Sequence, residues 1–170
     1  GKEVPIWKME QRFVEPVKKV LAERYEVDAH ESLEDCLLNV AVTFVNDNYQ
    51  DYLAELMEAK AGSLLEKLDE DNTRLQMLTA LSYSVGYMLH IRSGLPGRAY
   101  FGNSLDKVCN FNTPEVISIL GAAVSDMSEV LLREIAVLVQ DLQREERNQN
   151  RTFEVPADSR YDVNRTATTE

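Results

Sequence analysis

Apolar residues recur at intervals of three and four along almost the whole chain, and this period constrains the fold more than any other feature. Such a spacing places side chains on one face of an α-helix, whereas a strand needs apolar residues at alternate positions. Only 7 Gly and 5 Pro interrupt the pattern, too few for many short strands and turns. The sequence therefore predicts an all-α protein, a bundle of five or six helices.

The first two helices are predicted from an apolar stripe and a capping residue. The first covers residues 6–25, and Pro16 is expected to kink it or divide it, because proline removes a backbone donor and crowds the preceding turn. The second begins after Ser32, whose hydroxyl suits an N-cap, and it ends at the Asn-Asp-Asn run at 46–48.

Two further helices are predicted from the same period. The third runs from residue 49 to 68 and stops near the charged residues 70–72, and the fourth covers about 73–92. Gly86, inside the fourth, indicates a close approach between helices rather than a break. The inward positions of the fourth helix are predicted to be Leu75, Leu78, Leu81, Val85, Met88 and Leu89.

The last helix has the clearest start in the chain. Thr113 suits an N-cap and Pro114 suits the first helical position, and the apolar period then continues to 147. Residues 136–139 are apolar on every side, so we expect this helix to be covered all round, at the centre of the bundle or in an oligomer interface. Before it, residues 93–112 are expected to be irregular, with one short helix around 105–109.

Domain limits follow from where the period stops. Residues 1–147 are expected to form a single helical domain, and the polar, aperiodic residues 148–170 are expected to be a disordered tail or linker. The sequence starts with Gly rather than Met, which indicates a tag remnant or a segment of a longer protein.

Charge is concentrated in one part of the chain. Residues 26–72 carry thirteen acidic and two basic side chains, a net of −11, which equals the net charge of the whole chain. Such a surface repels nucleic acid and anionic lipid, so direct nucleic-acid binding is disfavoured. No apolar run approaches the roughly 20 residues of a membrane span, and no membrane partner is predicted.

The two cysteines, Cys36 and Cys109, are too few for a disulfide framework, and both are interpreted as buried thiols. The first residues lack the apolar core of a signal peptide. We therefore expect a cytoplasmic protein.

Candidate catalytic and metal-binding residues are few. His30 and Glu34 have the spacing of two metal ligands on one helix face, but no second histidine follows, and we favour a capped helix start with solvated charges. His90 follows an apolar face and is interpreted as a packed histidine. The sequence predicts no catalytic, cofactor or metal site, so we expect a protein that is not an enzyme.

One possible interaction surface is acidic. Asp47, Asp51, Glu55 and Glu58 follow helical spacing, and we favour a solvated helix face. Two alternatives stay open: paired carboxylates that hold a divalent ion, and carboxylates that imitate the phosphates of a duplex.

A second possible interaction surface is basic and aromatic, and includes Arg92, Arg98, Tyr100 and Phe101. Two glycines in this segment are spaced as in a phosphate-binding loop, but Asn103 occupies the position of the lysine of such a loop. We therefore reject a phosphate-binding loop here. The surface is suited to stacking a base or gripping an anion. We favour a structural role, in which the aromatic rings plug the bundle end and the arginines pair with the acidic helices.

Three stretches have a recognisable pattern: LSYSVGYMLHIRSGL at 81–95, FNTPEVISILGAAVSDMSEVLLREI at 111–135, and QREERNQNRTF at 143–153. Together they resemble a helical segment of the large LtrC-like, antirestriction-associated proteins carried by conjugative elements of gut Firmicutes. The resemblance covers the C-terminal half and implies a place in mobile-element biology. The antirestriction and zinc-peptidase-like signatures of neighbouring modules do not occur here, so no site residue is carried over.

Three functional hypotheses result. The first is a non-enzymatic interaction or scaffold module with a protein partner, self-associating through the 113–147 helix. The second is an acidic decoy that imitates DNA and binds a restriction enzyme or another DNA-binding protein through residues 26–72. The third is a metal-dependent enzyme that uses the acidic helices.

Overall fold

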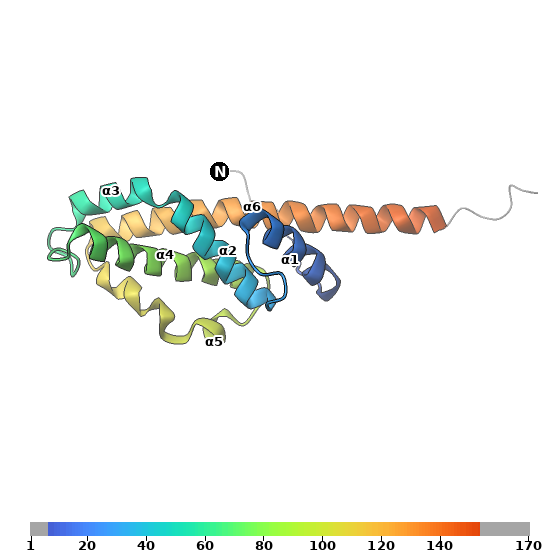
Figure 1. Ribbon diagram of the computed structural model, residues 1–170, viewed down its shortest axis with the longest axis horizontal. Helices are drawn as coiled ribbons and strands as arrows, with labels where there is room; N and C mark the ends of the chain where they lie inside the picture. Colours follow the sequence, from blue (N-terminus) through green and yellow to red (C-terminus); the bar gives the residue numbers. More distant parts are fainter. Residues whose placement is uncertain (1–6, 154–170) are drawn as a thin grey trace, which may run out of the picture.

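The computed structural model describes residues 7–153, and within them the chain is an all-α bundle without strands. The long C-terminal helix α6 packs against the four other long helices (Figure 1). The elements are α1 (Gln11–Tyr25), α2 (Leu33–Asn48), α3 (Gln50–Ala59), α4 (Glu70–Arg92), α5 (Gly97–Phe101), the 3-10 helix η1 (Gly102–Asn110) and α6 (Pro114–Phe153). The predicted fold class is confirmed.

Helix α1 begins later than predicted and is not divided. Its first helical residue is Gln11 rather than residue 6, and Pro16 lies inside a continuous helix. Because Pro16 is only the sixth residue of the helix, its missing donor removes a single hydrogen bond near the end, and the rest of the helix is intact.

The N-caps explain where α2 and α4 begin. Ser32 Oγ accepts a hydrogen bond from the Asp35 amide at 3.1 Å, as predicted. Asp69 Oδ1 does the same for the Asn72 amide at 2.8 Å, so α4 starts at Glu70 rather than at 73. The predicted third helix is also too long, since α3 ends at Ala59. Acidic residues stabilise the first turn of a helix, and the run at 70–72 begins a helix instead of ending one.

Residues 93–112 are more helical than predicted. Helix α5 was not expected, and η1 contains the short helix predicted at 105–109. The prediction that both cysteines are buried is confirmed for Cys36 and wrong for Cys109, which is exposed.

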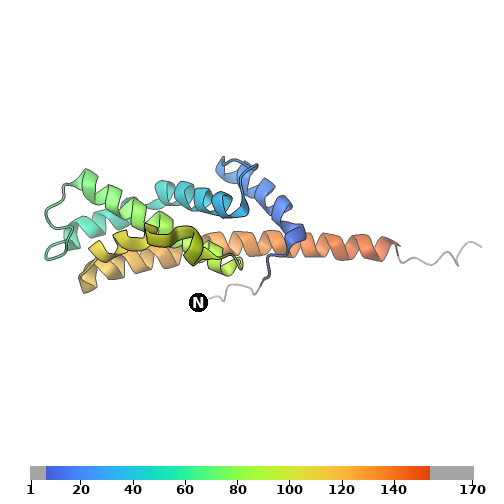
Figure 2. The same cartoon turned by 90° about the horizontal axis from the view of Figure 1, so that it is seen from below.

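Helix α6 has 40 residues and continues six residues beyond the predicted end at 147. The Val116 amide donates to Thr113 Oγ1 at 3.4 Å, in agreement with the predicted cap. The predicted disordered tail is therefore wrong for 148–153, and its remainder lies outside the described residues. In both ribbon views, the last part of α6 projects beyond the other helices (Figures 1 and 2).

The core of the bundle is closely packed around α4. A Cβ atom at Gly86 would lie 3.0 Å from Leu38 Cδ1 and 3.2 Å from Phe101 Cζ, which confirms the predicted close approach. Leu81, Val85 and Leu89 are buried as predicted, whereas Leu75 and Met88 are exposed. No described helix combines the length and the apolar character that a membrane span requires.

Candidate interaction surfaces

The acidic surface consists of Asp47 at the end of α2 and Asp51, Glu55 and Glu58 on α3. All four side chains are exposed, and none forms an ion pair with another described residue. The pKa of Tyr52 is raised to about 12, first by its hydrogen bond to Asp126 and by burial. The negative charges of Glu55 and Asp51 make a smaller contribution in the same direction. The four residues are solvated carboxylates, and three of them follow helical spacing on α3.

The basic arginines do not pair with the acidic surface. Arg92, at the end of α4, and Arg98, on α5, are exposed and form no ion pair with a described residue, so the predicted pairing is wrong. Tyr100 instead donates a hydrogen bond to Asp35 near the start of α2. Asp47 lies twelve residues further along α2, or about 18 Å at 1.5 Å per residue. The acidic and basic residues therefore belong to two separate surfaces.

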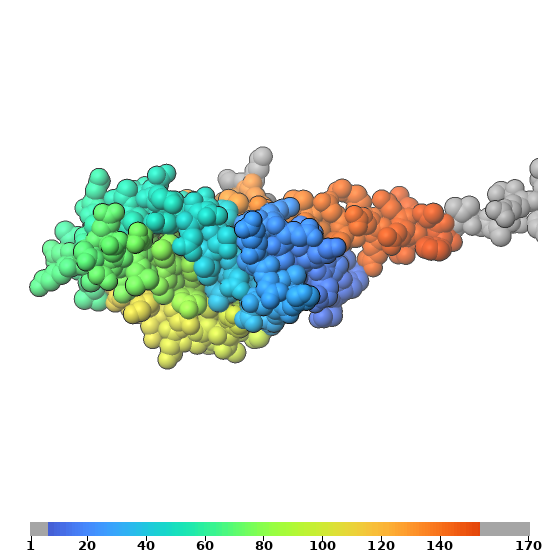
Figure 3. Space-filling view, viewed as in Figure 1, coloured from blue at the N-terminus to red at the C-terminus, as the bar shows by residue number. Residues whose placement is uncertain are grey.

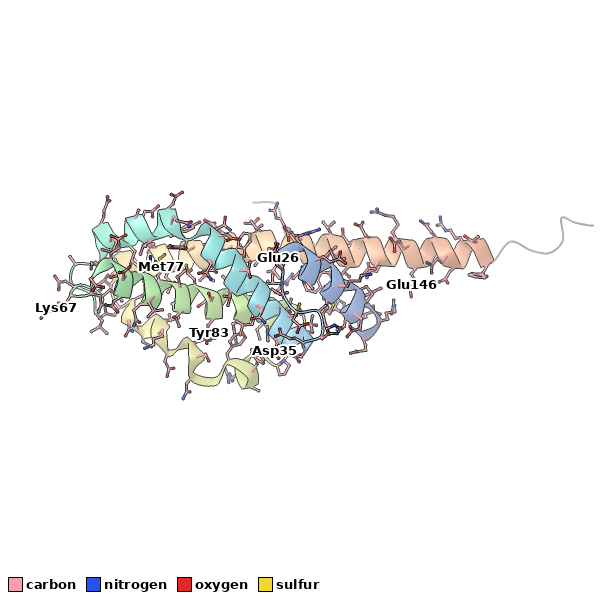
Figure 4. The ribbon with its side chains drawn as sticks, in the orientation of Figure 1. Glu26, Asp35, Lys67, Met77, Tyr83 and Glu146 are labelled. Atoms are coloured by element: carbon pink, nitrogen blue, oxygen red, sulfur yellow. The ribbon has the colours of Figure 1, made fainter. Side chains whose placement is uncertain are left out.

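The aromatic residues of α5 close the side of the bundle where α5 meets α4. Phe101 is buried, and its ring contacts the rings of Tyr83, Tyr87, His90 and Tyr100, with centroids 4.8–6.1 Å apart. In Figure 4, Tyr83 on α4 and Asp35 on α2 are both on the side of the bundle next to α5. Burial and the Asp35 hydrogen bond raise the pKa of Tyr100. Phe101 is thus part of the core and has no free face for stacking a base.

His90 is a fully buried histidine, as predicted. Its Nε2–H donates to the carbonyl oxygen of Glu34 at 2.8 Å, and its ring lies 4.6 Å from the ring of Tyr100. Burial lowers the pKa of His90, against the weaker opposing effects of the Glu34 hydrogen bond and the Glu34 and Asp35 charges. The arrangement holds a neutral imidazole between α4 and α2.

A pH dependence of stability follows from this burial. The pKa of His90 lies below its ordinary value of 6.5 in the folded chain, so the unfolded chain takes up the proton first as the pH falls. We expect the free energy of unfolding to be fully retained above pH 6.5 and to decrease as the pH falls through the window between 6.5 and the lowered pKa. Urea unfolding at a series of pH values measures this slope.

Replacement of His90 by Gln keeps a donor for the Glu34 carbonyl but removes the titration, so the slope in this window should flatten. His30→Gln is the matched control, because His30 is exposed. An unchanged slope in His90→Gln would contradict the assignment.

The structure shows where His30, Glu34 and Cys36 lie. His30 lies before α2, so His30 and Glu34 do not share a helix face as their spacing suggested. Among residues 7–153, no three His, Cys, Asp or Glu side chains come close enough to hold a metal ion. Burial raises the pKa of the Cys36 thiol to about 11, which keeps it protonated near neutral pH.

A groove between α1 and α6 was not foreseen from the sequence. It encloses about 480 Å³, and its lining residues are Pro16, Val17, Lys19, Val20, Glu23, Leu138, Asp141, Leu142 and Glu145. The periodic pattern marks Val20, Leu138 and Leu142 as apolar, but it contains no information that pairs α1 with the distant α6. Figure 3 shows the residues of α1 lying against α6 where α6 leaves the bundle.

Helix α6 also has an apolar outer face. Ala136 and Val139 are buried, but Val137 between them is 52% exposed, so the bundle itself does not cover this helix on every side, and the oligomer interface stays a prediction. Val130, seven residues earlier, is 45% exposed. No protein-family model matches the chain, and neither does any curated protein or any solved structure.

Proposed function

We propose that this chain is a non-enzymatic protein-interaction module of a cytoplasmic mobile-element protein, and that it self-associates through α6. The observation that carries the proposal is the outer face of α6, where Val130 and Val137 are both exposed. Residues seven apart lie only about 20° from each other around a helix, so these two side chains form one stripe. A stripe of this kind is how one helix packs along another.

The shape of α6 supports the same function. Its last buried residue is Val139, and the following fourteen residues up to Phe153 contain no buried side chain. Burial of an amphipathic face normally stabilises a helix. Leu142 still packs against the core, but residues 147–153, almost two turns, are all exposed. A partner helix along α6 would supply that burial.

Sedimentation velocity over about a hundredfold range of protein concentration tests self-association. The wild-type chain should shift toward a dimer as its concentration rises, and Val130→Glu with Val137→Glu should remain a monomer, because buried unpaired carboxylates oppose the interface. Ser118→Glu with Ala122→Glu is the control pair, since both residues are exposed on α6 outside the stripe. A wild-type chain that is monomeric throughout and captures no partner protein would refute the proposal.

A second candidate function is an acidic decoy for a DNA-binding protein. The observation in its favour is that Asp47, Asp51, Glu55 and Glu58 are exposed and unpaired with other described residues. A chain with amides at all four positions should then lose the inhibition of a restriction enzyme that the wild-type chain shows at low salt. Absence of inhibition by the wild-type chain would remove this candidate.

A further inference from the structure

Two ion pairs join α1 and α6, one beyond each end of the groove. Arg12 Nε lies 3.0 Å from Glu146 Oε1, and Arg24 Nη1 lies 3.3 Å from Glu134 Oε2. These pairs show that α1 and α6 have opposite chain directions, and both ribbon views show α1 inclined to α6 (Figures 1 and 2). Glu146 is on the outer part of α6, as Figure 4 shows. Between the two pairs the helices leave the apolar groove described above.

The groove has an apolar floor and a charged rim. The floor is formed by Pro16, Val17, Val20, Leu138 and Leu142. The rim carries the three carboxylates of Glu23, Asp141 and Glu145 and one ammonium group, that of Lys19. Of these four, only Asp141 pairs with another described residue, the exposed Arg144 at 3.3 Å. The rim therefore carries two more negative than positive charges, and the ion pair between Asp141 and Arg144 offsets one of them.

The dimensions of the groove fit a short helix. Its lining residues span 16–23 on α1 and 138–145 on α6, which is about two helical turns, or about 10 Å, on each wall. Two helices that diverge from an apolar floor accept a third helix whose side chains fill the gap between them. A helix of two to three turns offers apolar side chains three and four residues apart for this purpose.

We propose that the groove between α1 and α6 binds a basic amphipathic helix of a protein partner. Apolar side chains of that helix would fill the floor, and its lysines or arginines would face Glu23, Asp141 and Glu145. This inference rests on the proposed interaction function and names the class of partner. A second copy of the groove is disfavoured as the occupant, because two negative rims would then face each other.

Binding of a synthetic peptide tests the inference directly. The probe is a labelled helical peptide of about 16 residues, with leucines three and four residues apart and lysines beside them. Fluorescence anisotropy should show saturable binding to the wild-type chain. A scrambled peptide of the same composition should bind at least about tenfold more weakly, because its leucines no longer share one face.

Charge reversal on the rim separates the groove from general attraction to an acidic protein. Glu23→Lys with Glu145→Lys should weaken binding about tenfold, and circular dichroism should show an unchanged helix content, since both side chains are exposed. Glu66→Lys with Asp106→Lys is the matched control: it makes the same change in net charge at exposed positions away from the groove and should weaken binding less than about twofold.

Three results would overturn the inference: no binding of the peptide, equal binding of the scrambled peptide, or equal losses in the two charge-reversal pairs. Self-association through Val130 and Val137 is measured independently by sedimentation, so failure of the groove proposal is distinguishable from failure of the proposed function.

Discussion

Replacing Leu81 with Ala is expected to lower the free energy of unfolding by about 2–5 kcal/mol. Leu81 is fully buried on α4, the helix that packs against both α2 and α6. Removal of its side chain loses apolar burial and leaves a cavity that closely packed neighbours fill only partly. Because small domains are stable by about 5–15 kcal/mol, this is a large share of the total. Urea unfolding followed by the helical circular-dichroism signal measures the change.

Leu75→Ala is the matched control, because it is the same substitution on the same helix. Leu75 is 60% exposed, so its loss should change the free energy of unfolding by no more than about 0.5 kcal/mol. Equal losses at the two positions would show that Leu75 belongs to the core, as its spacing in the sequence suggested.

Phe101→Ala is expected to lower the free energy of unfolding by about 3–5 kcal/mol. The Phe101 ring is buried among four other rings and fixes α5 to α4. A five-residue helix is too short to be stable without tertiary contacts, so we also expect faster hydrogen exchange of the amides in 97–110. Exchange measured by mass spectrometry locates this effect.

Phe153→Ala provides the comparison, because Phe153 is 89% exposed and its loss should cost no more than about 0.5 kcal/mol. An exchange rate in 97–110 that is unchanged in Phe101→Ala would contradict the anchoring role of this ring. Phe101→Leu should recover part of the stability, since it restores apolar volume without the ring contacts.

Much of the fold could be predicted because local rules determine it. The period of three and four identifies helices, and Ser32 and Thr113 identify two of their starts, which the structure confirms. The start of α4 was misplaced because acidic residues at 70–72 suit both a solvated break and a first turn, and only the Asp69 cap distinguishes the two.

Positions inside α4 were predicted less well for a physical reason. Hydrophobicity predicts the large apolar residues as inward, yet the buried set includes the small residues Thr73, Ala80, Ser82 and Gly86. Where helices approach closely on several sides, a small side chain is what fits, and hydrophobicity alone does not identify it. Leu75 and Met88 are exposed in consequence.

The surfaces could be predicted only in part. Exposure of the carboxylates on α3 follows from helical spacing and was foreseen. The groove was not, because it requires knowing that residues 16–23 lie beside residues 138–145, and no local rule pairs segments so far apart in sequence. The same limit explains why the predicted pairing of Arg92 and Arg98 with the acidic helices is wrong. The sequence gives the charge of these arginines but not their distance from the acidic residues.

The projecting part of α6 sets both a distance and an angle for anything that binds near its end. Fourteen helical residues after Val139 place Phe153 about 21 Å further along the axis, and each residue turns the helix by about 100°. Insertion of one residue after Arg147 would therefore rotate a bound partner to another side of the bundle. Insertion of seven would move it outward by about 10 Å while nearly restoring its orientation. Each inserted residue thus changes the distance and the orientation of a bound partner together, and only insertions near a whole number of turns change the distance alone.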